Sequence, residues 1–211
     1  MNSSLIHNQV RVRYIVGILL LFHIVGLIIM LVDENSAQLS SLNLVLTGFL
    51  LFMSESNYFR ASLSLILIFV GGFVVEYIGV HTGFLFGDYT YGAALGPKMG
   101  EIPLVIGVNW FCIVLASSSL VFSLKANRIL KAILAGLLCT GLDFIIEPVA
   151  VKLDFWSWAD STIPIWNYVC WFAFASFFSF LYLSFAPAKN RTARSLFLIW
   201  IIFFSILNFV L

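Results

Sequence analysis

Three acidic residues, Glu76, Asp143 and Glu147, stand inside long apolar stretches of the chain. Asp143 and Glu147 are four residues apart, so they share one face of a helix. A carboxyl group in apolar surroundings favours its protonated form, which is the state that a general acid needs. Asn109 and Asn167 fall in apolar stretches as well. This set of residues predicts acid–base chemistry carried by carboxyl and amide groups.

The composition excludes several classes of protein. Hydrophobic residues make up 62% of the 211 positions and charged residues 10%, against about 45–50% and 25% in soluble domains. A water-soluble globule, a disordered chain and a nucleic-acid-binding protein are therefore excluded. The net charge of +1 produces no field that would attract a polyanionic partner. Phenylalanine is unusually frequent, with 22 residues.

The apolar stretches are long enough to cross a lipid bilayer, which needs roughly 20 residues per helix. We predict an all-α fold, a polytopic integral membrane bundle of about seven transmembrane helices that forms a single domain over residues 1–211. The predicted spans are Tyr14–Val32, Ala37–Met53, Ala61–Val80, Ile102–Leu124, Ile129–Val151, Pro164–Pro187 and Ser195–Leu211.

The basic residues predict the orientation. Loops on the same side as the N-terminus hold nine basic residues, whereas the opposite loops hold two, Lys98 and Lys152. Basic residues favour the cytoplasmic side, so we expect a multi-pass protein of the cell (inner, cytoplasmic) membrane with its N-terminus inside and its C-terminus outside. The nine residues are Arg11, Arg13, Arg60, Lys125, Arg128, Lys131, Lys189, Arg191 and Arg194.

In this orientation the acids and amides lie within about 6–12 Å of the outer helix ends. Two outer loops, residues 81–101 and 152–163, carry tyrosine, tryptophan and glycine next to these acids. Two helix faces of small and polar residues are expected to meet there. One holds Gly72, Glu76 and Gly79, and the other holds Gly136, Thr140, Asp143 and Glu147.

The sequence contains no motif for a metal or a cofactor. Three histidines are too few for a membrane di-iron enzyme, and no cysteine–histidine spacing is typical of zinc. No glycine-rich phosphate loop occurs, and the last span has no lysine for a retinal Schiff base. We therefore expect no cofactor and no metal. His23, alone in the first span, is interpreted as an interhelical hydrogen-bond partner.

Two blocks of residues resemble the membrane carotenoid hydratases, often described as carotenoid biosynthesis proteins, which include acyclic carotenoid 1,2-hydratases and bisanhydrobacterioruberin hydratases. The resemblance covers residues 76–172. The first block is Glu76, Gly79, Thr82-Gly83, Phe86-Gly87, Tyr89, Tyr91, Leu95-Gly96-Pro97, Pro103 and Trp110. The second is Asp143, Glu147-Pro148-Val149-Ala150, Trp156-Ser157-Trp158, Pro164, Asn167-Tyr168 and Trp171-Phe172.

The resemblance implies a carotenoid polyene and water as substrates, in the lipid bilayer, with other enzymes of the same pathway as further partners. Hydration of a terminal C=C bond needs a proton donor, a site that tolerates a carbocation, and a positioned water molecule. Asp143 is the preferred proton donor, and Glu147 or Glu76 orients or deprotonates the water. The expected substrate-binding residues are Tyr89, Tyr91, Asn109, Trp110, Trp156, Trp158, Asn167 and Trp171.

Other functions remain open at this point. A carotenoid end-group cyclase would use the same protonation, with an internal double bond capturing the cation. A proton-coupled transporter or channel would also bury acids in the membrane, although no polar pattern continues into the cytoplasmic half. A carotenoid-binding subunit without catalysis is the remaining alternative.

Overall fold

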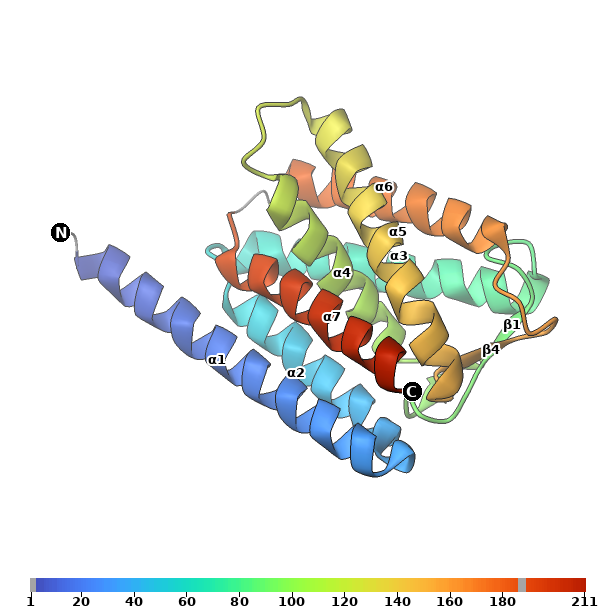
Figure 1. Ribbon diagram of the computed structural model, residues 1–211. Coiled ribbons are helices and arrows are strands. Elements are labelled where there is room, and N and C mark those ends of the chain that lie inside the picture. Colours follow the sequence, from blue (N-terminus) through green and yellow to red (C-terminus); the bar gives the residue numbers. More distant parts are fainter. Residues whose placement is uncertain (1–2, 186–188) are drawn as a thin grey trace.

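Seven α-helices run through the part of the chain that the computed structural model describes, residues 3–185 and 189–211 (Figure 1). A short 3-10 helix, η1 (Glu34–Leu39), precedes the second of them. The helices are α1 (Ser3–Val32), α2 (Ser40–Met53), α3 (Tyr58–Thr82), α4 (Val105–Val121), α5 (Arg128–Lys152), α6 (Ile165–Phe185) and α7 (Arg191–Val210).

Asparagine begins three of the helices. The side chains of Asn57, Asn127 and Asn190 each accept a hydrogen bond from the backbone N–H three residues further on. The first backbone N–H groups of a helix have no partner within the helix, so each of these caps favours the start of its helix.

Six helical segments are long and apolar enough to cross a membrane. They include η1 and α2 together, as Ser36–Met53, and only α4 is shorter. The prediction of seven apolar helices is therefore confirmed for the described chain. Several predicted boundaries differ by a few residues. The largest difference is at α1, which begins at Ser3 and not at Tyr14. Helix α4 is shorter than predicted, because Ile102–Pro103 form a strand ahead of it, and α6 ends at Phe185. Pro187, the predicted end of the sixth span, lies outside the described residues.

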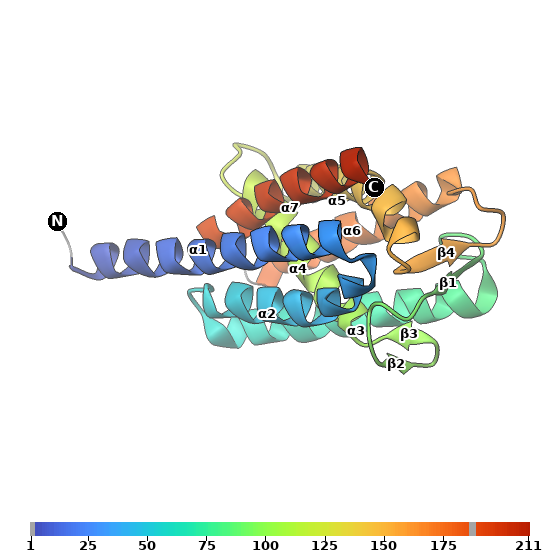
Figure 2. The same cartoon turned by 60° about the horizontal axis from the view of Figure 1, so that its bottom comes forward.

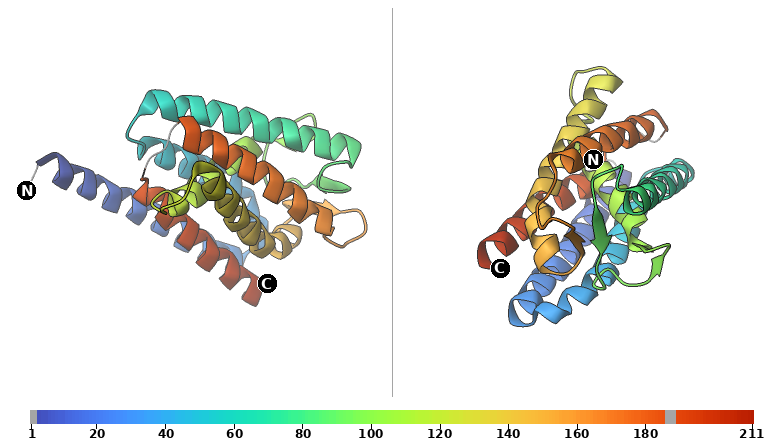
Figure 3. Two further views of the ribbon diagram at one scale, coloured as in Figure 1. Left: turned by 90° about the horizontal axis from the view of Figure 1, so that it is seen from above. Right: turned by 90° about the vertical axis from the view of Figure 1, so that its right-hand side faces the viewer.

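Helix α4 is the centre of the bundle. It packs against α2, α3, α5, α6 and α7, and fourteen of its seventeen residues are buried. Helix α1 lies at the edge, in contact with η1, α2 and α7 (Figures 1 and 3). Most outward-facing side chains of the helices are large and apolar, as expected of a surface in contact with lipid.

The prediction of a purely helical chain omits two small antiparallel sheets. Strand β1 (Tyr89–Tyr91) pairs with β4 (Trp156–Trp158), and β2 (Lys98–Met99) pairs with β3 (Ile102–Pro103). Figure 2 shows β1 and β4 side by side at one end of the bundle. Each strand has two or three residues, so the fold remains a helical bundle with a short sheet across one end.

The two faces of small residues do not meet as predicted. A Cβ atom added at Gly72 would lie 2.4 Å from a ring atom of Trp110 on α4. One added at Gly136 would lie 2.0 Å from the Ser176 hydroxyl on α6. The glycines therefore allow α3 to approach α4 and α5 to approach α6, because a larger residue would separate each pair.

Candidate active site

Glu76 on α3 accepts hydrogen bonds from three buried aromatic side chains. The hydroxyl groups of Tyr89 and Tyr91 donate to its Oε2 atom, at 2.5 and 2.7 Å. The indole Nε1 of Trp110 donates to its Oε1 atom at 3.0 Å. Since an unpaired buried carboxylate is strongly unfavourable, these three donors make a charged Glu76 tolerable in the interior.

Glu147 on α5 also has three donors, and two of them are tryptophans. Trp156 and Trp158 donate through Nε1 to its Oε2 atom, at 2.9 and 3.1 Å. The Nδ2 atom of Asn167 donates to its Oε1 atom at 3.0 Å. Each glutamate is thus held by donors from both a strand of the β1–β4 sheet and a neighbouring helix.

Asp143 lies one turn before Glu147 and is 1% exposed. Its Oδ2 atom accepts a hydrogen bond from the same Asn167 Nδ2 atom at 3.3 Å. One amide therefore bridges the two acids of α5. Asp143 forms no ion pair within residues 3–185 and 189–211, and its single weak donor leaves it the least stabilised of the three acids as an anion.

The β1–β4 sheet places four of the six hydrogen-bond donors of the two glutamates on its inner face. Tyr89 lies opposite Trp158, and Tyr91 lies opposite Trp156. Alternate side chains of a strand point to opposite faces, so these four rings share the inner face. Thr90 and the residue opposite it, Ser157, lie on the outer face with their hydroxyl oxygens 3.2 Å apart.

Both tyrosines remain hydrogen-bond donors. Burial, and then the neighbouring charge of Glu76, raises the pKa of Tyr89 and of Tyr91 well above the usual range. A phenol with a raised pKa keeps its proton at neutral pH. Each hydroxyl can therefore stabilise a negative charge on Glu76.

A cavity of about 20 Å³ lies between the two glutamates. This volume is about that needed for one water molecule. The cavity is lined by Glu76, Phe86, Tyr89, Tyr91, Ile106, Asn109, Glu147, Trp156, Trp158, Asn167 and Trp171. Polar groups from α3, α4, α5, α6 and the sheet thus converge on one small space.

The predicted site residues come together at this cavity, with two exceptions. Asp143 lies behind Asn167 and does not line the cavity. Trp110 also lies behind the lining, stacked on Trp171 with ring centroids 4.2 Å apart. Asn109 borders the cavity and forms no hydrogen bond with any residue that the structure describes.

The sequence-based interpretation missed Phe86 and Ile106 as lining residues, and it missed the pairing of the loop at residues 81–101 with the loop at residues 152–163. The signal for the pairing is present in the alternation Tyr-Thr-Tyr and Trp-Ser-Trp, which is typical of strands with one buried face. The hydrogen bond predicted for His23 is confirmed: Trp200 on α7 donates to its Nε2 atom at 2.9 Å. Among the described residues, no group of three or more His, Cys, Asp or Glu side chains is placed to hold a metal ion.

Comparison with known proteins agrees with the earlier resemblance. The bisanhydrobacterioruberin hydratase of Haloarcula japonica is 33% identical over 120 residues. That match covers 53% of this chain and 41% of the relative, so the chain spans less than half the length of this relative. No solved structure matches the chain. The family model described as "Carotenoid biosynthesis protein" matches residues 39–211. Since this match covers most of the chain, the protein belongs to the carotenoid biosynthesis protein family.

Proposed function

We propose that the protein hydrates the terminal C=C bond of an acyclic carotenoid end group, such as that of lycopene or γ-carotene, to a tertiary alcohol. The family and the name of the Haloarcula relative support this function. The observation that carries it is the water-sized cavity between Glu76 and Glu147, surrounded by aromatic rings. Hydration of an alkene requires a proton, a water molecule and a stabilised cation, and all three have a candidate partner here.

In the proposed reaction, the proton comes from the Asp143–Glu147 pair. Two carboxyl groups that share one amide are costly to charge together, so one of them keeps a proton. Asp143, the proton donor expected from the sequence, does not line the cavity, so Glu147, which does, delivers that proton to the less substituted alkene carbon. Asp143 has the fewest donors, so it stores the proton of the pair. The positive charge then forms on the carbon that carries two methyl groups.

Water completes the reaction at that carbon. The oxygen of a water molecule held by Asn109 and Asn167 forms the new C–O bond. The water loses one proton to a carboxylate, which restores the proton used in the first step. Aromatic faces stabilise a desolvated cation by about 2 kcal/mol or more. Tyr89, Trp158 and Trp171 are in position to do so, and the charge of Glu76 adds to the effect.

The test is expression in a host that accumulates lycopene, with mass spectrometry of the pigments. A hydratase adds the mass of one water molecule for each end that reacts. The matched variant Glu147→Gln keeps the shape of the side chain, and we expect it to abolish that product. A cyclised product of unchanged mass would show that the protein is an end-group cyclase and not a hydratase. Unchanged lycopene beside a folded, membrane-inserted protein would contradict catalysis.

We also propose the orientation that follows from the basic residues, with the N-terminus in the cytoplasm and the site in the outer half of the cell membrane. The site would then receive a polyene dissolved in the bilayer. The variants Ser3→Cys and Asp160→Cys test this orientation. Each new cysteine is labelled in the cell membrane from the outer or from the cytoplasmic side.

A further inference from the structure

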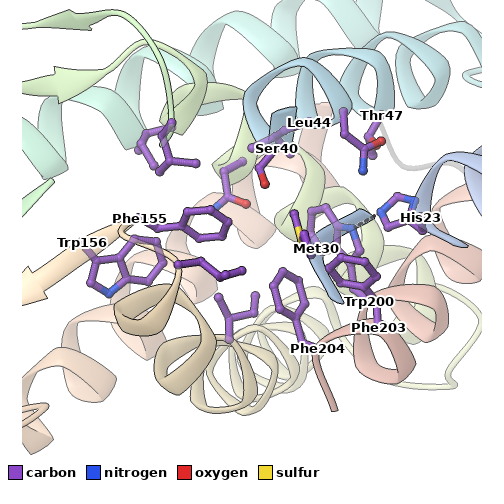
Figure 4. Close-up of a pocket in the computed structure, with 16 residues that line it drawn as sticks. His23, Met30, Ser40, Leu44, Thr47, Phe155, Trp156, Trp200, Phe203 and Phe204 are labelled. Atoms are coloured by element: carbon purple, nitrogen blue, oxygen red, sulfur yellow. Dashed lines mark hydrogen bonds between the residues drawn. The ribbon is translucent and has the colours of Figure 1, made fainter. Parts of the chain in front are cut away.

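A second, larger cavity lies beside the carboxylates. Its volume is about 80 Å³, and we call it the end-group chamber. It is bordered by α1, α2, α4, α5 and α7 (Figure 4). Figure 4 shows Met30, Leu44, Phe155, Phe203 and Phe204 among the apolar side chains around it.

The chamber adjoins the small cavity between the glutamates. Ile106, Asn109 and Trp156 line both spaces. Of these three, Asn109 carries an amide without a hydrogen bond to any described residue, and it stands at the boundary between an apolar space and a carboxylate. The two spaces therefore share part of their walls, and Asn109 is the polar residue in the shared part.

The size and lining of the chamber fit a small branched hydrocarbon group. A buried apolar cavity of about 150 Å³ accepts benzene, so about 80 Å³ leaves room for roughly three carbon atoms. An isopropylidene end, a carbon that carries two methyl groups, has this size. A six-membered ring carrying methyl groups does not fit without displacement of a wall.

Two polar atoms on the wall of the chamber have no partner within the described chain. They are the Ser40 hydroxyl oxygen and the Asn43 Oδ1 atom, both on α2. These residues are three positions apart and thus on one face of the helix. A tertiary alcohol can accept a hydrogen bond from Ser40 and donate one to Asn43, which would satisfy both atoms.

We propose that this chamber binds the isopropylidene end of the polyene and its hydrated form, and that it selects acyclic ends over rings. The proposal rests on the proposed hydratase function for the identity of the reaction. Helix α1 contributes Met30 and His23 to the wall, although it lies outside the family match. His23 is fixed there by bonds to Trp200 and to the Leu19 carbonyl oxygen. Substrate selection thus depends in part on α1, α2 and α7, which carry none of the three acids of the site.

The first test narrows the chamber. Leu44→Phe adds a ring to its wall, and Leu42→Phe makes the same change on the outer face of α2, where Leu42 is 68% exposed. Purified wild type and variants are incubated with lycopene in detergent, and both retained pigment and hydrated product are measured. We expect Leu44→Phe to lower lycopene retention by about tenfold or more, the effect of a small misfit in an apolar pocket. Leu42→Phe should match the wild type.

Because Leu44→Phe could also disturb folding, the second test enlarges the chamber. We expect Phe204→Ala to increase retention of β-carotene, whose ends are rings, relative to the wild type. Misfolding does not produce such a gain. If Leu44→Phe retains lycopene as well as Leu42→Phe does, or if Phe204→Ala gains no retention of β-carotene, the chamber does not bind the end group.

Retention separates this proposal from the proposed reaction. The wild type could retain lycopene without hydrating it, while Leu44→Phe retains it weakly. This result would contradict the hydratase function and support binding of the end group in the chamber. Hydration that survives in Leu44→Phe at the wild-type rate would support the hydratase and overturn the chamber.

Discussion

Tyr89 and Trp158 lie directly opposite one another in the β1–β4 sheet, yet they bind different acids. The Tyr89 hydroxyl donates to Glu76 on α3, and the Trp158 indole donates to Glu147 on α5. Their rings are in contact, with centroids 5.3 Å apart. One residue pair of a short sheet therefore fixes the separation of two carboxyl groups that come from helices with little direct contact.

Tyr89→Phe tests this link. The change removes the 2.5 Å hydrogen bond to Glu76, and a hydrogen bond to a charged group contributes about 1.5–3 kcal/mol. We expect a lower thermal stability in detergent and a loss of hydratase activity. Thr90→Ala on the outer face of the same strand is the control and should leave activity intact. Equal activity of Tyr89→Phe and the wild type would show that the sheet does not position Glu76 for the reaction.

Asp143→Asn tests the chemical role of Asp143 separately from its contribution to the structure. The variant keeps the size of the side chain but cannot release or store a proton. Since general acid–base catalysis contributes about 10²- to 10⁴-fold, we expect a loss of this order in product formation. Phe144→Leu, next along the same helix and 64% exposed, is the control. Product formation by Asp143→Asn at the level of Phe144→Leu would exclude Asp143 from the chemistry.

The helices could be predicted from the sequence, because each apolar segment between charges carries its own signal. Residues 76, 143 and 147 were also recognisable, since acids in such segments are rare. The partners of the acids were harder to predict. Thr90 and Ser157 are 67 positions apart in the sequence, and strands of three residues are too short to give a strong local signal.

The end-group chamber could not be predicted in this way. Its walls come from five helices, from Leu95 in the loop after β1, and from the residues that follow α5. No local pattern marks an apolar side chain that borders a cavity. The same holds for Gly72 and Gly136. Their spacing predicts close helix packing, but it does not identify the neighbouring helix that each one contacts.

Glu55 lies between α2 and α3, outside the membrane-spanning segments and far from the site. Its titration predicts how the stability of the protein depends on pH. It accepts hydrogen bonds from Asn190 at 2.8 Å and from Tyr182 at 3.3 Å. Burial raises the pKa of Glu55 above its ordinary value despite these donors. The folded chain therefore holds this proton more tightly than the unfolded chain does.

The consequence for stability has a definite sign. The contribution of Glu55 to the free energy of unfolding is fully present below the ordinary carboxyl pKa of about 4.3. It is lost as the pH rises through the raised value. We expect Glu55→Gln to remove this part of the pH dependence, measured by thermal unfolding in detergent from pH 4 to 8. Parallel curves for Glu55→Gln and the wild type would contradict the prediction.

Gly136→Ala tests the close contact between α5 and α6. The added Cβ atom would lie 2.0 Å from the Ser176 hydroxyl and 3.0 Å from the Phe172 carbonyl oxygen on α6. The hydroxyl can rotate away, but the carbonyl is backbone, so α5 and α6 must separate. Overpacking of this kind costs about 1–3 kcal/mol, and we expect a lower midpoint of thermal unfolding.

Gly141→Ala is the matched control, because nothing lies within 4 Å of its added Cβ atom. Alanine favours a helix by about 1 kcal/mol over glycine, so Gly141→Ala should be neutral or stabilising. Separation of α5 from α6 would also pull Asn167 away from Asp143 and Glu147. Activity should therefore fall further in Gly136→Ala than its folded fraction does. If both alanine variants unfold at the same temperature, α5 and α6 are not held together as closely as the structure has them.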